Sequence, residues 1–157
     1  MIEVLINNET GFQCDEAQLR KVVTAILADH DIADAEVSLA IIDDSTMHVL
    51  NRDHLQHDYP TDVLSFLLEL TDGYLDGEVV VSHETAASVA PEYGWPAESE
   101  LLLYFVHGTL HLVGYDDHSD DDRRAMRERE SHYLRLVGVE PPSGHHSRVL
   151  QQGEASA

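Results

Sequence analysis

The sequence predicts a small α/β domain, in which strands and helices pack as layers around one core. The chain has 157 residues, of which 43% are apolar, so it is long enough for one domain and too short for two. Short runs rich in β-branched residues alternate with longer segments whose apolar residues recur at helical spacing. Mixed elements of this kind form layered domains. We expect the domain to comprise residues 1–140 and residues 141–157 to form a loose tail, because "SGHHSRVLQQGEASA" has few core-forming residues.

Three strands and two helices are expected in the first half of the chain. The strand segments, which combine β-branched residues with alternation, are "IEVLIN" (2–7), "AEVSLAIID" (35–43) and "DVLSFLLE" (62–69). The first helix is expected over about residues 15–30, where apolar residues recur at helical spacing. Ser45 and Thr46 are suitable N-caps for a second helix, which we expect to end near Leu55.

One strand and three helices are expected in the second half. The strand is "EVVVS" (78–82), which follows the turn-rich connector "DGYLDG" (72–77). The helices are expected over 83–93, ended by Gly94 and Pro96; over 98–113, ended by Gly114; and over 120–137, where Ser119 and Asp122 resemble a capping box.

Net charge is the unusual feature of the composition. Thirty acidic residues face nine basic ones, a formal net charge of −21. Such a surface attracts divalent cations and repels phosphate backbones at long range, which by itself argues against a nucleic-acid partner. One segment is an exception, because it holds five of the eight arginines: Arg123, Arg124, Arg127, Arg129 and Arg135. This segment is either a solvated helix, in which Glu128 and Glu130 alternate with the arginines, or a small basic patch beside the nearby histidines.

Several features predict a cytoplasmic protein without a membrane segment. Cys14 is the one cysteine, so no internal disulfide is possible, which fits a reducing compartment. The start of the chain, "MIEVLINNET", lacks the basic and apolar regions of a signal peptide. The apolar run "LLLYFV" (101–106) is far shorter than the ~20 residues that span a bilayer.

The segment "FVHGTLHLVGYDDH" (105–118) carries the strongest prediction of chemistry. His107 and His111 lie four residues apart on a predicted apolar helix, so both side chains project from one face and can offer two imidazoles to Zn²⁺. Gly114 ends this helix and turns the chain back. The third ligand is ambiguous within the Asp-Asp-His run of residues 116–118. Two core histidines bonded to the backbone are the alternative, which the glycine turn and the ligand-type residues after it disfavour.

"HGTLHLVGYD" resembles the signature of the YbeY family, the metal-dependent endoribonucleases of bacterial rRNA maturation. "VSLAIIDDSTMHVLN" (37–51), "DYPTDVLSF" (58–66) and "GEVVVSHETA" (77–86) resemble other blocks of this family in the same order. The resemblance implies a single compact domain with a mixed, mostly parallel four-stranded sheet packed by helices, and one Zn²⁺ in a zincin-like cleft. It also implies single-strand-specific cleavage of rRNA precursors, including 16S 3′-end processing, and a role in ribosome quality control. The implied partners are rRNA precursors and the ribosome or a ribosomal protein, without DNA or membrane.

The resemblance also favours one third ligand. The family's third histidine lies ten residues after the first, and a methionine follows nine residues later. Those positions are Asp117 and Met126 in this sequence, so no insertion is needed. We therefore expect Asp117 to complete the site with His107 and His111, and His118 is the alternative if one residue has been inserted. Zinc accepts carboxylate oxygen at about 2.0–2.2 Å, close to its distance to nitrogen.

Contacts with the substrate are less well defined by the sequence. Family members usually carry an arginine thought to engage RNA where this chain has Leu55. Arg52, one helical turn earlier, is the candidate replacement, and Thr61 and Asp62 are further candidates for binding the substrate. No general base is assigned, since the nearby Asp116 could equally orient a ligand histidine.

Three functions fit these observations, and a metal-dependent endoribonuclease fits them best. A metallopeptidase is disfavoured, because Gly108 stands where the HExxH peptidases carry their glutamate base. A ribosome-associated factor with a structural metal, and weak or no nuclease activity, is favoured by Leu55 and by the net charge. A structural zinc site would be closed by four protein ligands, which separates this third function from the first.

Overall fold

The computed structural model of this protein describes residues 1–55 and 63–142. At its centre is a four-stranded sheet in the order β1-β2-β4-β3, built from β1 (Ile2–Asn8), β2 (Asp34–Ile42), β3 (Val63–Thr71) and β4 (Tyr74–Ser82). β1, β2 and β4 run parallel, whereas β3 pairs antiparallel with β4 at one edge. The expected mixed, mostly parallel sheet of four strands is confirmed.

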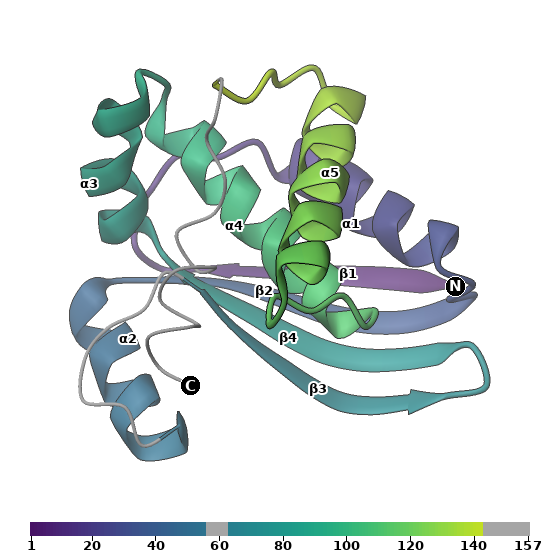
Figure 1. The fold of residues 1–157 in the computed structure, drawn as a ribbon. Coiled ribbons are helices and arrows are strands. Elements are labelled where there is room, and N and C mark those ends of the chain that lie inside the picture. The colour runs from purple at the N-terminus through teal and green to yellow at the C-terminus, as the bar shows by residue number, and fades with distance from the viewer. Residues whose placement is uncertain (56–62, 143–157) are drawn as a thin grey trace.

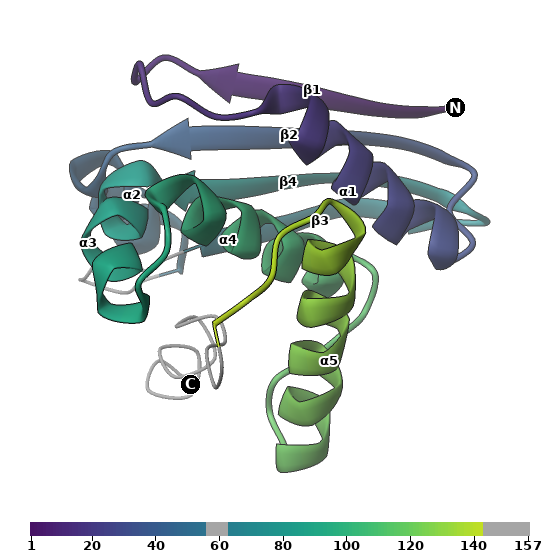
Figure 2. The same ribbon diagram turned by 90° about the horizontal axis from the view of Figure 1, so that it is seen from above.

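Helices cover the two faces of the sheet unequally (Figure 1). One face, called the helical face below, carries α1 (Glu16–Asp29), α3 (His83–Tyr93), α4 (Ala97–Leu112) and α5 (Asp120–Leu136). The opposite face carries α2 (Asp44–Leu50), which packs Met47 against Leu64 and Val80 of the sheet. A π-helix, Asn51–Leu55, continues α2. Seen from above, α4 lies among α1, α3 and α5, and it contacts all three (Figure 2).

α4 is the most buried helix, because its apolar residues occur on all sides. Residues 101–106, "LLLYFV", are all buried, and so are Leu110 and Leu112 further along the same helix. They share one core with apolar residues of α1, α5 and the helical face of the sheet. The two histidines of the motif are thus carried by a helix that the core holds in place.

Gly108 allows α4 to lie close against the sheet. A β-carbon at this position would lie 2.5 Å from Val79 Cγ1 on β4 and 2.9 Å from Ser65 Oγ on β3, which is too close for packed atoms. Ser65 Oγ also donates a hydrogen bond of 2.9 Å to the Gly108 carbonyl. The glycine that follows the first histidine therefore sets the distance between the helix and the β3–β4 hairpin.

The predicted N-cap of α2 is wrong. Asp43, and not Ser45 or Thr46, caps the helix: its side chain accepts a hydrogen bond of 2.8 Å from the Thr46 amide. Four consecutive residues, 43–46, have side chains that can cap a helix. The end of β2 at Ile42 decides among them, because the helix begins as soon as the strand ends.

The predicted connector 72–77 is also wrong, because only Asp72 and Gly73 form the turn between β3 and β4. Both residues have positive φ, 46° and 81°, as a two-residue hairpin turn requires and as Asp-Gly favours. Gly77, which suggested a turn, lies inside β4. A β-carbon there would lie 3.1 Å from the Leu112 side chain and 3.1 Å from the Phe66 carbonyl, so this glycine serves close packing.

Of the predicted tail, residues 141–157, the structure describes only 141 and 142, and the rest lies outside the described residues. None of the described helices is both long enough and apolar enough to cross a membrane.

Candidate metal centre

Three side chains meet where α4 ends and the chain turns towards α5. His107 Nε2 and His111 Nε2 lie 3.0 Å apart, because residues four apart share one face of a helix. Asp117 Oδ2 lies 3.4 Å from His111 Nε2 and 3.9 Å from His107 Nε2. These three residues form one of two groups in the described part of the chain whose ligand atoms are close enough to hold a metal ion.

Hydrogen bonds on the far side of each ring leave both Nε2 atoms facing the same point. His107 Nδ1 donates to Glu130 Oε2 at 2.6 Å, and His111 Nδ1 donates to the Tyr115 carbonyl at 3.0 Å. When one nitrogen of a neutral imidazole donates, the other is an acceptor. Two lone pairs 3.0 Å apart repel unless a proton or a metal ion lies between them, so this arrangement favours a cation.

The dimensions and the charge of the group both fit a divalent ion. Tetrahedral coordination at about 2.0–2.2 Å places neighbouring ligand atoms about 3.3–3.6 Å apart, and the three separations here are 3.0, 3.4 and 3.9 Å. Asp117 and Glu130 are carboxylates that are only 7% and 2% exposed. Buried charges are costly unless they are compensated, and a divalent cation between the histidines balances these two.

The loop after α4 directs Asp117 towards the histidines. Gly114, with φ of 106°, turns the chain after the helix. The Asp117 amide donates to Asp116 Oδ1 at 2.8 Å, and Arg123 Nη1 donates to the Asp117 carbonyl at 3.1 Å. These two bonds hold the backbone on both sides of the Asp117 side chain, which fixes where its carboxylate points.

His118 points away from this group. Its side chain is 70% exposed, and its Nε2 lies 3.0 Å from Asp116 Oδ1. Asp116, Asp117 and His118 form the second group that could hold a metal ion, at the surface and without the helical histidines. The structure therefore brings Asp117, rather than His118, to the histidine pair. It also places Asp116 beside His118 and not beside a helical histidine.

Two opposing effects set the pKa of the Asp117 carboxyl. Burial alone raises this pKa, because a buried charge is poorly solvated. When these histidines carry a proton in place of a metal ion, the hydrogen bond from His111 and the charges of His111, His107 and His118 outweigh burial, so the pKa of Asp117 lies below its ordinary value. Asp117 is thus ionised at neutral pH and needs to release no proton to bind a cation.

Glu130, which the sequence suggests only as a charge on a solvated helix, is instead buried beside His107 and is a site residue that the motif does not reveal. It lies on α5, is buried, and holds His107 through the 2.6 Å bond. Its Oε1 has no hydrogen-bond partner among the described residues. A signal for it was present, because Met126, Glu130, Tyr133 and Leu134 form the buried stripe of α5 at helical spacing. A glutamate within such a stripe requires a partner in the core.

Comparison with known proteins identifies the family. A family model described as Endoribonuclease YbeY matches residues 5–138. The chain belongs to the YbeY family. It is 43% identical over 151 residues to the endoribonuclease YbeY of Rhodopirellula baltica, an alignment that covers 89% of this chain and 78% of that protein. It is 45% identical over 130 residues to the endoribonuclease YbeY of Syntrophotalea carbinolica, and this alignment covers 78% of this chain and 86% of that protein. The solution structure of TM1509 from Thermotoga maritima aligns over 99% of this chain and 95% of that chain, with a TM-score of 0.60 and 25% identity.

Of the three candidate substrate residues of this YbeY protein, the structure describes only Arg52, which lies away from the metal centre. Arg52 lies in the π-helix after α2, beyond the opposite face of the sheet, and its Nε is 3.4 Å from Asp53 Oδ1. The described contacts do not join Arg52 to His107, His111 or Asp117. Thr61 and Asp62 lie outside the described residues.

Four of the five arginines on α5 form an ion pair with an acidic side chain. On α5, Arg123 pairs with Asp120, and Arg124 lies 2.9 Å from Asp121. Near the end of the helix, Arg135 pairs with Glu140 at 2.9 Å. Of the two interpretations of this segment, the ion pairs favour the solvated helix over a basic patch, except that Glu130 is buried and does not belong to the solvated surface.

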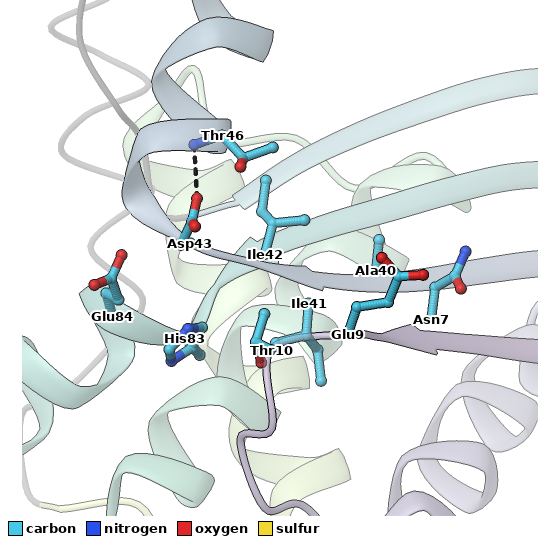
Figure 3. A pocket seen from close by; sticks show the side chains of 10 residues that line it. All are labelled: Asn7, Glu9, Thr10, Ala40, Ile41, Ile42, Asp43, Thr46, His83 and Glu84. Atoms are coloured by element: carbon cyan, nitrogen blue, oxygen red, sulfur yellow. Dashed lines mark hydrogen bonds between the residues drawn. The ribbon is translucent and has the colours of Figure 1, made fainter.

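A cavity of about 560 Å³ lies away from the histidine pair, at the carboxyl ends of β1 and β2 (Figure 3). Its polar wall includes Asp43, His83 and Glu84, and Asp43 is occupied in capping α2. Neither of the two metal-binding groups in the described residues includes a residue of this cavity. The group of His107, His111 and Asp117, which lies at the end of α4, is therefore separate from this cavity.

Proposed function

We propose that this YbeY protein is a metal-dependent endoribonuclease that cuts single-stranded segments of rRNA precursors. Family membership supports a hydrolase that acts on phosphodiester bonds in rRNA processing. The observation that carries the metal-dependent reaction is the convergence of His107, His111 and Asp117 on one point. Processing of the 16S 3′ end and a role in ribosome quality control are finer parts of the same proposal.

We propose Zn²⁺ as the metal, with His107 Nε2, His111 Nε2 and Asp117 Oδ2 as its ligands. Two histidines and a carboxylate form a catalytic zinc set that leaves one position open. Zinc bound there supplies an acidified water and polarises a phosphoryl oxygen. The chain's own contribution is orientation, because Glu130 and the Tyr115 carbonyl hold the two rings. The His111 side chain, 27% exposed, marks the side from which RNA reaches the site.

A metallopeptidase of the HExxH kind is disfavoured by packing as well as by sequence. The glutamate base of such enzymes would stand at Gly108, where even a β-carbon would lie 2.5 Å from Val79 Cγ1. A larger side chain at this position would force α4 off the sheet, and with it His107 and His111. The helix is therefore built without the group that peptide hydrolysis by this route requires.

A purely structural metal is disfavoured by the number of ligands. Structural zinc is closed by four protein ligands, whereas the buried group in the described residues contains three. Glu130 cannot be the fourth in this arrangement, because its Oε2 is bonded to the opposite side of the His107 ring.

The RNA itself is proposed to contact Arg52, Thr61 and Asp62 as well as the metal centre. The net charge of −21 makes an unassisted approach to RNA unfavourable at long range. The ribosome or a ribosomal protein is therefore proposed as the partner that brings enzyme and substrate together. An rRNA substrate also supports the cytoplasm as the place of the reaction.

The test is cleavage of an rRNA precursor by purified protein loaded with Zn²⁺. The wild type should cleave and should lose activity when the metal is chelated. His111→Ala should be inactive, whereas His118→Ala, which alters a neighbouring exposed histidine, should retain activity. Circular dichroism of each variant checks that it is folded. A zinc-loaded wild type that binds rRNA without cutting it would replace this proposal by that of a binding factor.

A further inference from the structure

The described elements cover only half of the sheet face that lies opposite the helical face. Among the described elements, α2 alone lies on it, over the end where Leu64 and Val80 pack against Met47. Figure 1 shows α2 below one end of the sheet and no described helix below the other end. This uncovered end, called the open face below, is formed by the first residues of β1, β2 and β4 and the last residues of β3.

A row of four carboxylates crosses the open face. Glu3 on β1 pairs in register with Glu36 on β2, Glu36 pairs with Asp76 on β4, and Asp76 pairs with Glu69 on β3. Residues paired in register project from the same face of a sheet. Neighbouring strands lie about 4.8 Å apart, so this carboxylate row spans about 14 Å.

The carboxylate row is not neutralised within the described residues. Glu3, Glu36 and Glu69 are exposed and Asp76 is half-buried, yet no described basic side chain forms an ion pair with any of the four. Like charges directly opposite one another destabilise a sheet. The negative charge of the carboxylate row also acts on Tyr74. The pKa of Tyr74 is raised first by burial and then by the charges of Asp76, Glu36 and Glu69.

We infer that the open face is a docking site for a basic helical segment of a partner protein. The charges are complementary, because lysines or arginines at i, i+3 or i+4 and i+7 of a helix lie about 5–6 Å apart, close to the spacing of the carboxylate row. The open face also offers an apolar contact to the same helix, because Leu5 of β1 lies on this face and is 44% exposed. This surface is independent of the metal centre, since α4 and α5 lie on the helical face.

Two other occupants fit the open face less well. RNA is repelled, because its phosphates carry the same charge as the carboxylate row. A single divalent ion needs ligand atoms that converge, and the row is not among the groups of the described residues whose carboxylate oxygens do so. A partner that distributes several positive charges over about 14 Å matches the arrangement better than one ion.

The test uses a lysine-rich helical peptide with its lysines on one face, and a scrambled peptide of the same composition. Wild-type protein should bind the ordered peptide about tenfold more tightly than does the variant with Glu36→Gln and Asp76→Asn, which removes the two central charges of the row. That variant should fold, because the changes relieve repulsion. The matched control carries Asp121→Asn and Glu128→Gln on α5, loses the same net charge, and should bind the peptide like the wild type.

Amide chemical shifts locate the bound peptide, and they should change at the open face and not on α5. Preference for the ordered peptide, lost only in the Glu36 and Asp76 variant, supports the proposal. Equal weakening in both variants would mean attraction by bulk charge alone and would overturn it. Saturable Mg²⁺ binding at Glu36 and Asp76 that displaces the peptide would overturn the proposal in favour of a cation site. Changes in amide chemical shift at the same strands with RNA, but not with the peptide, would overturn it in favour of a nucleic-acid surface.

Discussion

His107 and Glu130 are separated by 23 residues in the sequence and joined by a buried hydrogen bond of 2.6 Å from Nδ1 to Oε2. This bond ties α4 to α5 at the candidate metal centre. It sets the tautomer of His107, so that Nε2 is an acceptor directed at His111 and Asp117. A carboxylate behind a ligand histidine also raises the basicity of the ring and holds its orientation.

Glu130→Gln is expected to weaken metal binding about 10–100-fold, because the amide keeps the shape of the side chain but removes its charge. Competition with a chromophoric chelator measures the affinity for Zn²⁺ directly, without reference to RNA cleavage. Glu128→Gln is the matched control, since Glu128 is on the same helix with its side chain 74% exposed, and its affinity should stay at the wild-type value. Equal affinities of the two variants for Zn²⁺ would show that Glu130 does not orient His107 for metal binding.

Asp117→Ala should lose bound zinc as severely as His111→Ala, while His118→Ala should keep it. The reason is placement: Asp117 Oδ2 lies 3.4 Å from His111 Nε2, whereas His118 faces Asp116 at the surface. Metal content after dialysis, measured by elemental analysis, gives the answer. Loss of zinc in His118→Ala with retention in Asp117→Ala would show that His118 is the third ligand and that the proposed ligand set is wrong.

The candidate site could be predicted as far as local geometry determines it. His107 and His111 share a helix face by their spacing alone, and Gly114 permits the turn that returns Asp117 to them. Glu130 could not be placed in the same way, because its bond to His107 depends on how α5 packs against α4. The sequence shows that Glu130 lies on the buried stripe of α5 but does not show which group in the core meets it.

The order of the helices and strands was predicted correctly from the sequence. The N-cap of α2 and the start of β4 were predicted wrongly. Asp43 caps α2 because β2 stops at Ile42, and no local property of residues 43–46 selects among four capping side chains. The start of β4 was misplaced because Gly77 was taken for a turn residue. Its function, close approach to Leu112 of α4, depends on a helix that packs there only in the folded chain.

Tyr133→Phe should destabilise the protein less at high pH than at neutral pH. The Tyr133 hydroxyl donates to Asp29 Oδ2 at 2.8 Å, and burial followed by Asp29 raises the pKa of the phenol. A raised pKa in the folded state contributes stability that is present below the ordinary tyrosine value of about 10 and is lost as the pH rises above it. At about pH 8 the free energy of unfolding of the variant should therefore be about 1 kcal/mol lower than that of the wild type. This difference should shrink at about pH 11. Urea titrations at both pH values measure it, and a constant difference would contradict the prediction.

Gly108→Ala should lower the free energy of unfolding by about 1–3 kcal/mol, the usual cost of adding a methyl group to a packed interface. The added carbon would lie 2.5 Å from Val79 Cγ1 and 2.9 Å from Ser65 Oγ, so α4 must shift and carry His107 with it. Zinc affinity should therefore fall along with stability. Ser99→Ala, near the start of the same helix, is the control and should change neither. Wild-type stability and zinc affinity in Gly108→Ala would show that α4 does not depend on this glycine to approach the sheet.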